Sequence, residues 1–223
     1  ALSDTATDFD ALKSNIDLAI STIQTAIDGI DAISELVNQA KGLASNAKAT
    51  GNTNERSTLA VQFNELLSQI NTIANDSSFN GTNLLQASPD NLAVEFNTDN
   101  TSNLTITGLD STTATSGINI AVAANNFGLN ANIDTALTAI SSALTTLRSN
   151  ASTMGSRNTI LTTRLDFTDN LVNTLEGGTG KLTLADLNEE SANLLALQTR
   201  QQLGINSLAL AAQSERSILA LFG

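Results

Sequence analysis

The chain has 223 residues, of which 41% are hydrophobic, and it carries 22 acidic against 10 basic side chains, for a formal net charge of −12. Such a charge repels phosphate backbones and anionic lipid, which argues against binding to nucleic acid or to membrane surfaces. The sequence contains no Cys and no His, so disulfides, thiolate metal sites and the commonest general base are excluded. We therefore expect neither an enzyme nor a bound cofactor or metal.

The first long segment, residues 9 to 47, has apolar side chains in two sets with seven-residue spacing. One set is Phe9, Ile16, Ile23, Ile30, Val37 and Ala44, and the other is Leu12, Ala19, Ala26, Ile33, Ala40 and Ala47. This a/d heptad pattern predicts a single helix of roughly 58 Å that packs as in a coiled coil.

A second helix is expected over residues 55 to 75, after a break at residues 51–54. Its apolar stripe consists of Leu59, Phe63, Leu66, Leu67, Ile70 and Ile73. The break is predicted because Gly and Asn are the residues that most readily adopt turn conformations.

From about residue 77 to residue 130 the hydrophobic period changes to two, which predicts short strands. The alternating residues are Leu92, Val94 and Phe96, then Leu104 and Ile106, then Ile118, Ile120 and Val122. Turns are expected at Asn80 with Gly81, at residues 99–100 and at residues 116–117.

Helical periodicity resumes over residues 133 to 175, where the heptad again runs unbroken. Its members are Ile133, Ile140, Leu147, Met154, Leu161, Thr168 and Leu175, with Leu137, Leu144, Ala151, Asn158, Leu165 and Val172. Asn158 is polar at a seam position, so we expect it to lower stability while fixing the register between neighbouring helices. Residues 176–181 are Gly-rich and predict a break after this helix.

The last segment begins with a capping-box-like start at Thr183 and Asp186 and is predicted to be a helix to residue 222. Its apolar side chains do not fit one stripe, so this helix needs partners on several sides. We predict that it assembles with other subunits through Leu194, Leu197, Leu203, Ile205, Leu208, Ala212, Leu219 and Phe222.

Together these patterns predict a mainly α fold: an elongated, antiparallel, coiled-coil-like helical rod with a small β-hairpin region. Residues 1–78 would form the amino-terminal half of the rod, and residues 79–130 an outer region of hairpins. Residues 131–180 would form the carboxy-terminal half, and residues 181–223 a terminal assembly helix.

This order of elements resembles bacterial flagellin, and three segments carry the resemblance. They are FNGTNLL at residues 79–85, LLALQTRQQLG at 194–204 and SILALF at 217–222. The amino-acid sequence is most similar to flagellins of alphaproteobacteria. The resemblance implies a structural subunit that polymerises into the extracellular flagellar filament for motility after export by the flagellar secretion apparatus. The implied partners are other subunits, an export chaperone, and cap and junction proteins. The family's amino-terminal core helix is missing before Ala1, so we expect a truncated chain.

Many flagellins carry an Arg-rich patch on the first rod helix that a vertebrate toll-like receptor recognises. The matching residues here are Gln39, Lys41 and Leu43, and Gln39 replaces the expected Arg. The resemblance therefore implies weak activation of that receptor.

Two alternatives stay open from the sequence. A hook-filament junction protein would share the rod and the termini but would not polymerise indefinitely. A surface adhesin or glycan-binding homologue would place its site in the strand region, where Asn91, Asn97, Asn100 and Asn103 are polar but no aromatic platform is present.

Overall fold

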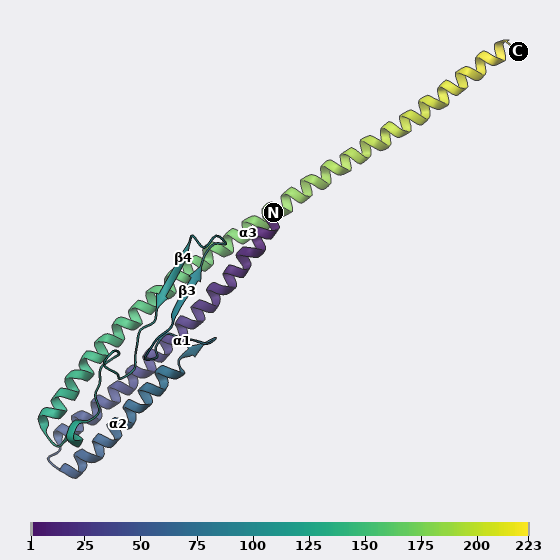
Figure 1. Ribbon diagram of the computed structural model, residues 1–223. Helices are drawn as coiled ribbons and strands as arrows, with labels where there is room; N and C mark the ends of the chain where they lie inside the picture. Colours follow the sequence, from purple (N-terminus) through teal and green to yellow (C-terminus); the bar gives the residue numbers. More distant parts are fainter. Residues whose placement is uncertain (1, 223) are drawn as a thin grey trace. The chain divides into compact units, whose positions relative to one another are not determined.

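The computed structural model describes the backbone of residues 2–222 and the side chains of residues 2–217 (Figure 1). The helices are α1 (Leu2–Ala49), α2 (Thr53–Asp76) and α3 (Asn130–Phe222), with a short 3-10 helix, η1 (Ala124–Phe127), before α3. Two antiparallel hairpins lie between α2 and η1: β1 (Ser78–Phe79) with β2 (Thr82–Asn83), and β3 (Asn91–Glu95) with β4 (Asn103–Thr107). The chain divides into two compact units. One consists of residues 7–171, and the other combines the two chain ends, residues 1–6 and 172–223.

Within the unit of residues 7–171, α1, α2 and α3 lie side by side and the hairpins run along them (Figure 1). The predicted heptad seams form the core. On α1, all the predicted seam residues are buried except Phe9, which is half-buried. On α3, the seam residues that are fully enclosed are Ile133, Ile140, Leu147, Met154 and Leu161. The mainly helical, antiparallel fold predicted from the sequence is confirmed.

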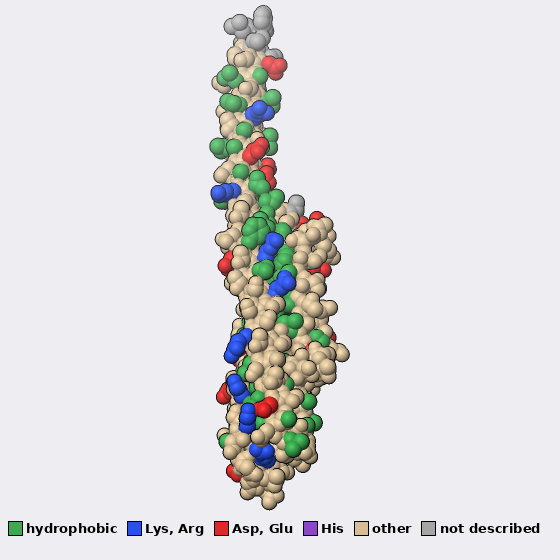
Figure 2. Space-filling model, turned by 90° about the vertical axis from the view of Figure 1, so that its left-hand side faces the viewer, with side chains coloured by type: hydrophobic (Ala, Val, Ile, Leu, Met, Phe, Trp, Pro, Cys, Tyr) green, Lys and Arg blue, Asp and Glu red, His purple; other side chains and the backbone are tan. Residues whose placement is uncertain are grey.

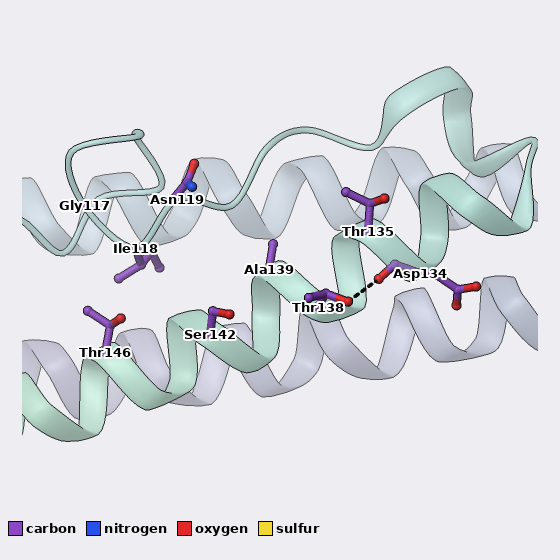
Figure 3. A pocket seen from close by; sticks show the side chains of 9 residues that line it. All are labelled: Gly117, Ile118, Asn119, Asp134, Thr135, Thr138, Ala139, Ser142 and Thr146. Carbon is purple, nitrogen blue, oxygen red and sulfur yellow. Dashed lines mark hydrogen bonds between the residues drawn. The ribbon is translucent and has the colours of Figure 1, made fainter.

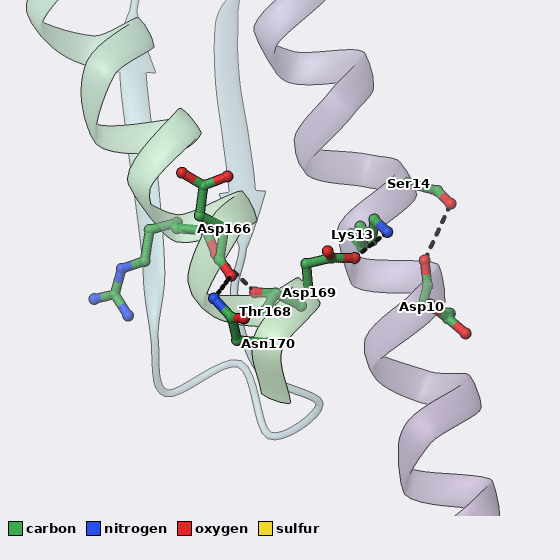
Figure 4. A network of polar contacts seen from close by, with 8 residues as sticks. Asp10, Lys13, Ser14, Asp166, Thr168, Asp169 and Asn170 are labelled. Carbon is green, nitrogen blue, oxygen red and sulfur yellow. Dashed lines mark hydrogen bonds and ion pairs between the residues drawn. The ribbon is translucent and has the colours of Figure 1, made fainter. Parts of the chain in front are cut away.

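Two ion pairs join α1 to α3 at well-separated points. Lys13 on α1 pairs with Asp169 on α3 (Figure 4), and Lys48 Nζ lies 2.6 Å from Asp134 Oδ1. In both pairs the two residue numbers add to the same total. The two helices therefore run antiparallel without any slip in register between these points.

The break between α1 and α2 was predicted correctly, and side chains fix it. Asn52 caps α2 by accepting a hydrogen bond from the Asn54 amide at 3.0 Å. Arg56 then binds the turn to the start of α3, because its guanidinium donates to the Thr50 carbonyl at 2.8 Å and to Asn130 Oδ1 at 2.7 Å.

Hairpin turns occur where positive φ was expected. Asn80 and Gly81 have φ of 50° and 79°, and Asn100 has φ of 54° in the β3–β4 turn. In the β3–β4 ladder, Leu92 pairs with Ile106 and Val94 with Leu104. The inward side chains of this hairpin join the same core as the helices.

The third predicted strand, at residues 118–122, is wrong. Ile118 and Ile120 are buried, but Val122 is 67% exposed and the segment pairs with no strand. Instead, the amides of Ile118 and Ile120 donate to the carbonyls of Thr112 and Thr113, which closes a compact loop. The alternation of apolar residues here reflects contact with the helices rather than a ladder.

The predicted break at residues 176–181 is also wrong, because α3 continues through it to Phe222. Each Gly costs roughly 1 kcal/mol relative to Ala in a helix, but Gly retains its amide and, unlike Pro, does not interrupt the backbone hydrogen bonds. The hydroxyl of Thr183 donates to the Thr179 carbonyl one turn earlier, at 2.9 Å. Thr183 is thus an interior helical residue and not the cap of a new helix.

Candidate functional site

The carboxy-terminal part of α3 exposes apolar side chains to an extent found nowhere else in the described chain. Every residue from 180 to 217 is exposed, including ten large aliphatic side chains. Their exposed fractions range from 51% at Leu194 to 77% at Leu208. From residue 191 to residue 214 the only charged side chain is Arg200.

The predicted assembly residues lie on this segment. Leu194, Leu197, Leu203, Ile205, Leu208 and Ala212 are exposed. Leu219 and Phe222 belong to the same prediction, but their side chains lie outside the described residues. Burying one exposed Leu or Ile side chain stabilises a protein by about 1.5–3 kcal/mol. Covering all the apolar side chains of this segment would therefore release a large amount of free energy. In the described part of the chain no helix is both long and apolar enough to cross a membrane.

A groove of about 560 Å³ lies between α3 and the loop at residues 117–119 (Figure 3). Its α3 side is lined by hydroxyls, and that of Thr138 donates to the backbone carbonyl of Asp134 at 2.9 Å. Asp134 itself pairs with Lys48. The carboxylate that lines this groove is therefore held in an ion pair.

A second groove, of about 590 Å³, runs between α1 and α2 and includes two of the three receptor-patch residues. Gln39 and Leu43 line it on α1, opposite Gln62 and Leu66 on α2. Lys41 is exposed but does not line this groove. The structure therefore brings Gln39 and Leu43 together and leaves Lys41 on a neighbouring surface.

Two polar side chains of the strand region, Asn97 and Asn103, take part in the β3–β4 turn. Asn97 uses its side chain to close the β3–β4 turn, since its amide nitrogen donates to Thr101 Oγ1 at 2.6 Å and its oxygen accepts from the Ser102 amide. Asn103 donates to the Asn100 carbonyl at 3.3 Å. Within the described residues no cluster of His, Cys, Asp or Glu could hold a metal ion.

The FNGTNLL segment is structural, and Asn83 explains why. This buried side chain donates to the carbonyls of Ala74 and Asn75, at 2.9 and 2.8 Å, which satisfies the end of α2. Its oxygen accepts from the amides of Leu85 and Gln86. One side chain therefore both ends a helix and turns the chain toward the next hairpin.

Comparisons with known proteins bear on both ends of the chain. The model of the bacterial flagellin N-terminal helical region matches residues 1–90, and that of the bacterial flagellin C-terminal helical region matches residues 137–222. Flagellin FljM of Caulobacter vibrioides is 35% identical over 98% of this chain and 79% of its own length. A flagellin of Brucella melitensis is 29% identical over 95% and 78%. The crystal structure of Bacillus cereus flagellin shares the fold, with a TM-score of 0.60 at 20% identity over 69% of this chain and 88% of that one.

Proposed function

We propose that the carboxy-terminal segment of this chain, which belongs to the bacterial flagellin family, is the part that joins it to other subunits; this segment is residues 181–223. Members of this family are structural proteins rather than enzymes. The chain is a structural subunit of the flagellar filament, an extracellular polymer of flagellin subunits that serves motility.

The observation that carries the proposal is the all-round apolar surface of residues 182–210, which has no core of its own. A helix with apolar residues on one face needs one partner, whereas one with apolar residues on every side needs several. Neighbouring subunits in a polymer supply such surroundings. We assign residues 1–78 and 131–180 to the two halves of the rod and residues 79–130 to its outer region.

The test is polymerisation of the purified chain in a salt that strengthens apolar burial, followed by sedimentation and electron microscopy. Leu197→Asp with Leu208→Asp would place two charges in the subunit contacts and abolish filaments. The matched control, Gln198→Asp with Gln213→Asp, adds the same charge to the same segment and retains them. Filaments from the Leu variant equal to those from the control would refute the proposal.

The length of the filaments separates two roles within the family. A filament subunit adds to a growing end without limit, whereas a hook-filament junction protein forms only a short layer. Long filaments from the unaltered chain support the first role, and short rings or discs that do not grow support the second.

The exposed segment also implies partners before assembly. An apolar helix of this size invites aggregation unless something covers it, which supports binding by an export chaperone. Export through the flagellar secretion apparatus is consistent with a chain that has no Cys and hence no disulfides to form. Cap and junction proteins at the two ends of the filament complete the proposed partners.

Receptor activation is proposed to be weak. Gln39 is exposed at the place where many flagellins carry Arg, and an amide cannot supply the fixed charge or the five donors of a guanidinium. In a reporter cell line that expresses the toll-like receptor for flagellin, Gln39→Arg should raise the response. An unaltered chain as active as an enterobacterial flagellin would contradict this proposal.

A further inference from the structure

The exposed face of α1 carries a row of carboxylates, which we call the acidic stripe. Seven residues turn an α-helix through nearly two full turns, so residues at that spacing lie one above another. Both Asp10 with Asp17 and Asp28 with Glu35 have this spacing, and Asp31 lies between the second pair. All five are exposed, and they lie outside the buried seam of Ile16, Ile23 and Ile30.

One flank of α3 carries the opposite charge together with exposed apolar side chains, and we call it the arginine stripe. It consists of Arg157, Ile160, Arg164 and Phe167, at helical spacing. Phe167 is 59% exposed and Ile160 is 40% exposed. Figure 2, which views the molecule from the α3 side, shows Lys and Arg side chains interspersed with hydrophobic ones on this face.

One residue of the arginine stripe, Arg164, contacts the neighbouring hairpin. The guanidinium of Arg164 lies 4.9 Å from the centre of the Phe96 ring, a cation–π contact that limits its freedom. Arg and aromatic side chains are the residue types that contribute most to protein–protein contacts, and in this stripe Arg164 and Phe167 are exposed while Arg157 is half-buried.

The two stripes match in spacing as well as in charge. Arg157 and Arg164 are seven residues apart, about 10.5 Å along the helix, and so are the two acidic pairs. Among residues 2–217 the ion pairs join Lys13 to Asp169 and Lys48 to Asp134, and none uses a charge of either stripe. Both stripes lie in the unit of residues 7–171.

We propose that the arginine stripe of one chain docks on the acidic stripe of a second copy, so that two ion pairs flank a contact made by Ile160. This inference rests on the proposed function, because it names the lateral surfaces through which subunits meet. Copies with a net charge of −12 repel one another in most orientations, and this pairing is one that replaces repulsion by attraction. Charge therefore selects the orientation, and the apolar side chains add contact area.

The first test reverses the arginine stripe. Arg157→Glu with Arg164→Glu should raise the concentration of chain left unpolymerised at low salt at least about tenfold. The effect should shrink near 1 M salt, where the Debye length falls to about 3 Å. Lys41→Glu with Arg148→Glu is the matched control, because it changes the net charge by the same amount at two exposed residues that lie outside both stripes.

A rescue experiment identifies the partner. Adding Asp10→Lys with Asp17→Lys, or Asp28→Lys with Glu35→Lys, to the reversed chain should restore assembly for the pair that the arginines meet. Circular dichroism melts of each variant establish that it folds. Rescue by one pair supports the proposal, whereas failure of both pairs in folded variants overturns it.

A second readout does not depend on filaments, because the chain has no Cys and can be given single ones. Ile160→Cys chains are mixed with Ser14→Cys or Asp31→Cys chains, whose cysteines lie within the acidic stripe, and treated with a short bismaleimide. Cross-linked dimers should exceed those formed by Arg148→Cys chains severalfold. If the stripe cysteines and the Arg148→Cys control give equal yields of cross-linked dimer, the inference is overturned even if the chain polymerises. If the stripe cysteines give the higher yield but no filaments form, the inference is supported and the proposed function fails.

Discussion

Replacing Asn158 by Leu should stabilise the protein, although Asn158 lies at a seam position where polarity was expected to fix register. Its side-chain oxygen is buried and, among the described residues, has no hydrogen-bond partner. Met154 and Leu161, its neighbours along the seam, are fully buried. The register between α1 and α3 is already held by the ion pairs of Lys13 and Lys48. The carboxamide therefore costs stability without being needed for alignment.

The expected gain follows from two terms. A buried acceptor without a partner costs about 1–3 kcal/mol, and Leu removes that cost. Leu also buries further apolar surface, but Asn158 is only half-buried as a residue, so this second gain is partial. We expect a net gain of about 1–2 kcal/mol, which corresponds to a rise in Tm of about 2–8 °C for a protein of this size.

The assay is thermal unfolding followed by circular dichroism, at the same protein concentration for every variant. Asn46→Leu is the control, because it makes the same chemical change at an exposed position on α1 and should alter stability by less than about 0.5 kcal/mol. A Tm for Asn158→Leu that equals or falls below that of the unaltered chain would refute the reasoning, because it would mean that the amide oxygen is satisfied in solution.

Three further predictions concern single side chains. Gly29→Ala should destabilise by about 1–3 kcal/mol in denaturant unfolding, because a β-carbon there would lie 2.3 Å from Ser77 Oγ; Gly42→Ala, which meets nothing within 4 Å, should stabilise by about 0.5–1 kcal/mol. Asn83→Ala should cost about 2–4 kcal/mol in the same assay, because four backbone groups lose their partner. The carboxylate bonded to Lys13 raises the pKa of this lysine above 10.5, so the stabilisation is complete below pH 10.5 and is lost as pH rises further. In Lys13→Met, Tm should consequently fall less steeply in this alkaline range.

The helical core was predictable because its signal is repeated many times. Each seam position of α1 is one of a series at fixed spacing, so a single exception such as Phe9 does not obscure the pattern. The turns at Asn80 and Asn100 were predictable for a different reason, namely that few residue types tolerate positive φ. In both cases local chemistry and tertiary contacts favour the same structure.

The errors arose where one local pattern is compatible with two structures. Alternating apolar residues at 118–122 predict a strand, yet alternate burial needs only a surface on one side and no partner strand. The glycines at 177, 178 and 180 predict a break, yet a helix tolerates them when its hydrogen bonds remain intact. Contact with the distant helices decides the structure of residues 118–122, and the uninterrupted backbone hydrogen bonds decide that of the glycine segment. Neither can be recognised in a short stretch of sequence.

The two proposed assembly surfaces differ in how far the sequence could reveal them. Residues 182–210 stand out because apolar side chains occur on every side of the helix, which no seam within one chain can satisfy. The acidic stripe has a weaker signal, because Asp10 and Asp17 keep the seven-residue spacing but the next position of the series, residue 24, is Gln. Apolar periodicity does not reveal the acidic stripe, and the arginine stripe on α3 is identifiable only once the exposure of Phe167 is known. In a chain that assembles with copies of itself, periodic charge on the outer face of a helix is therefore informative in addition to periodic hydrophobicity on the inner one.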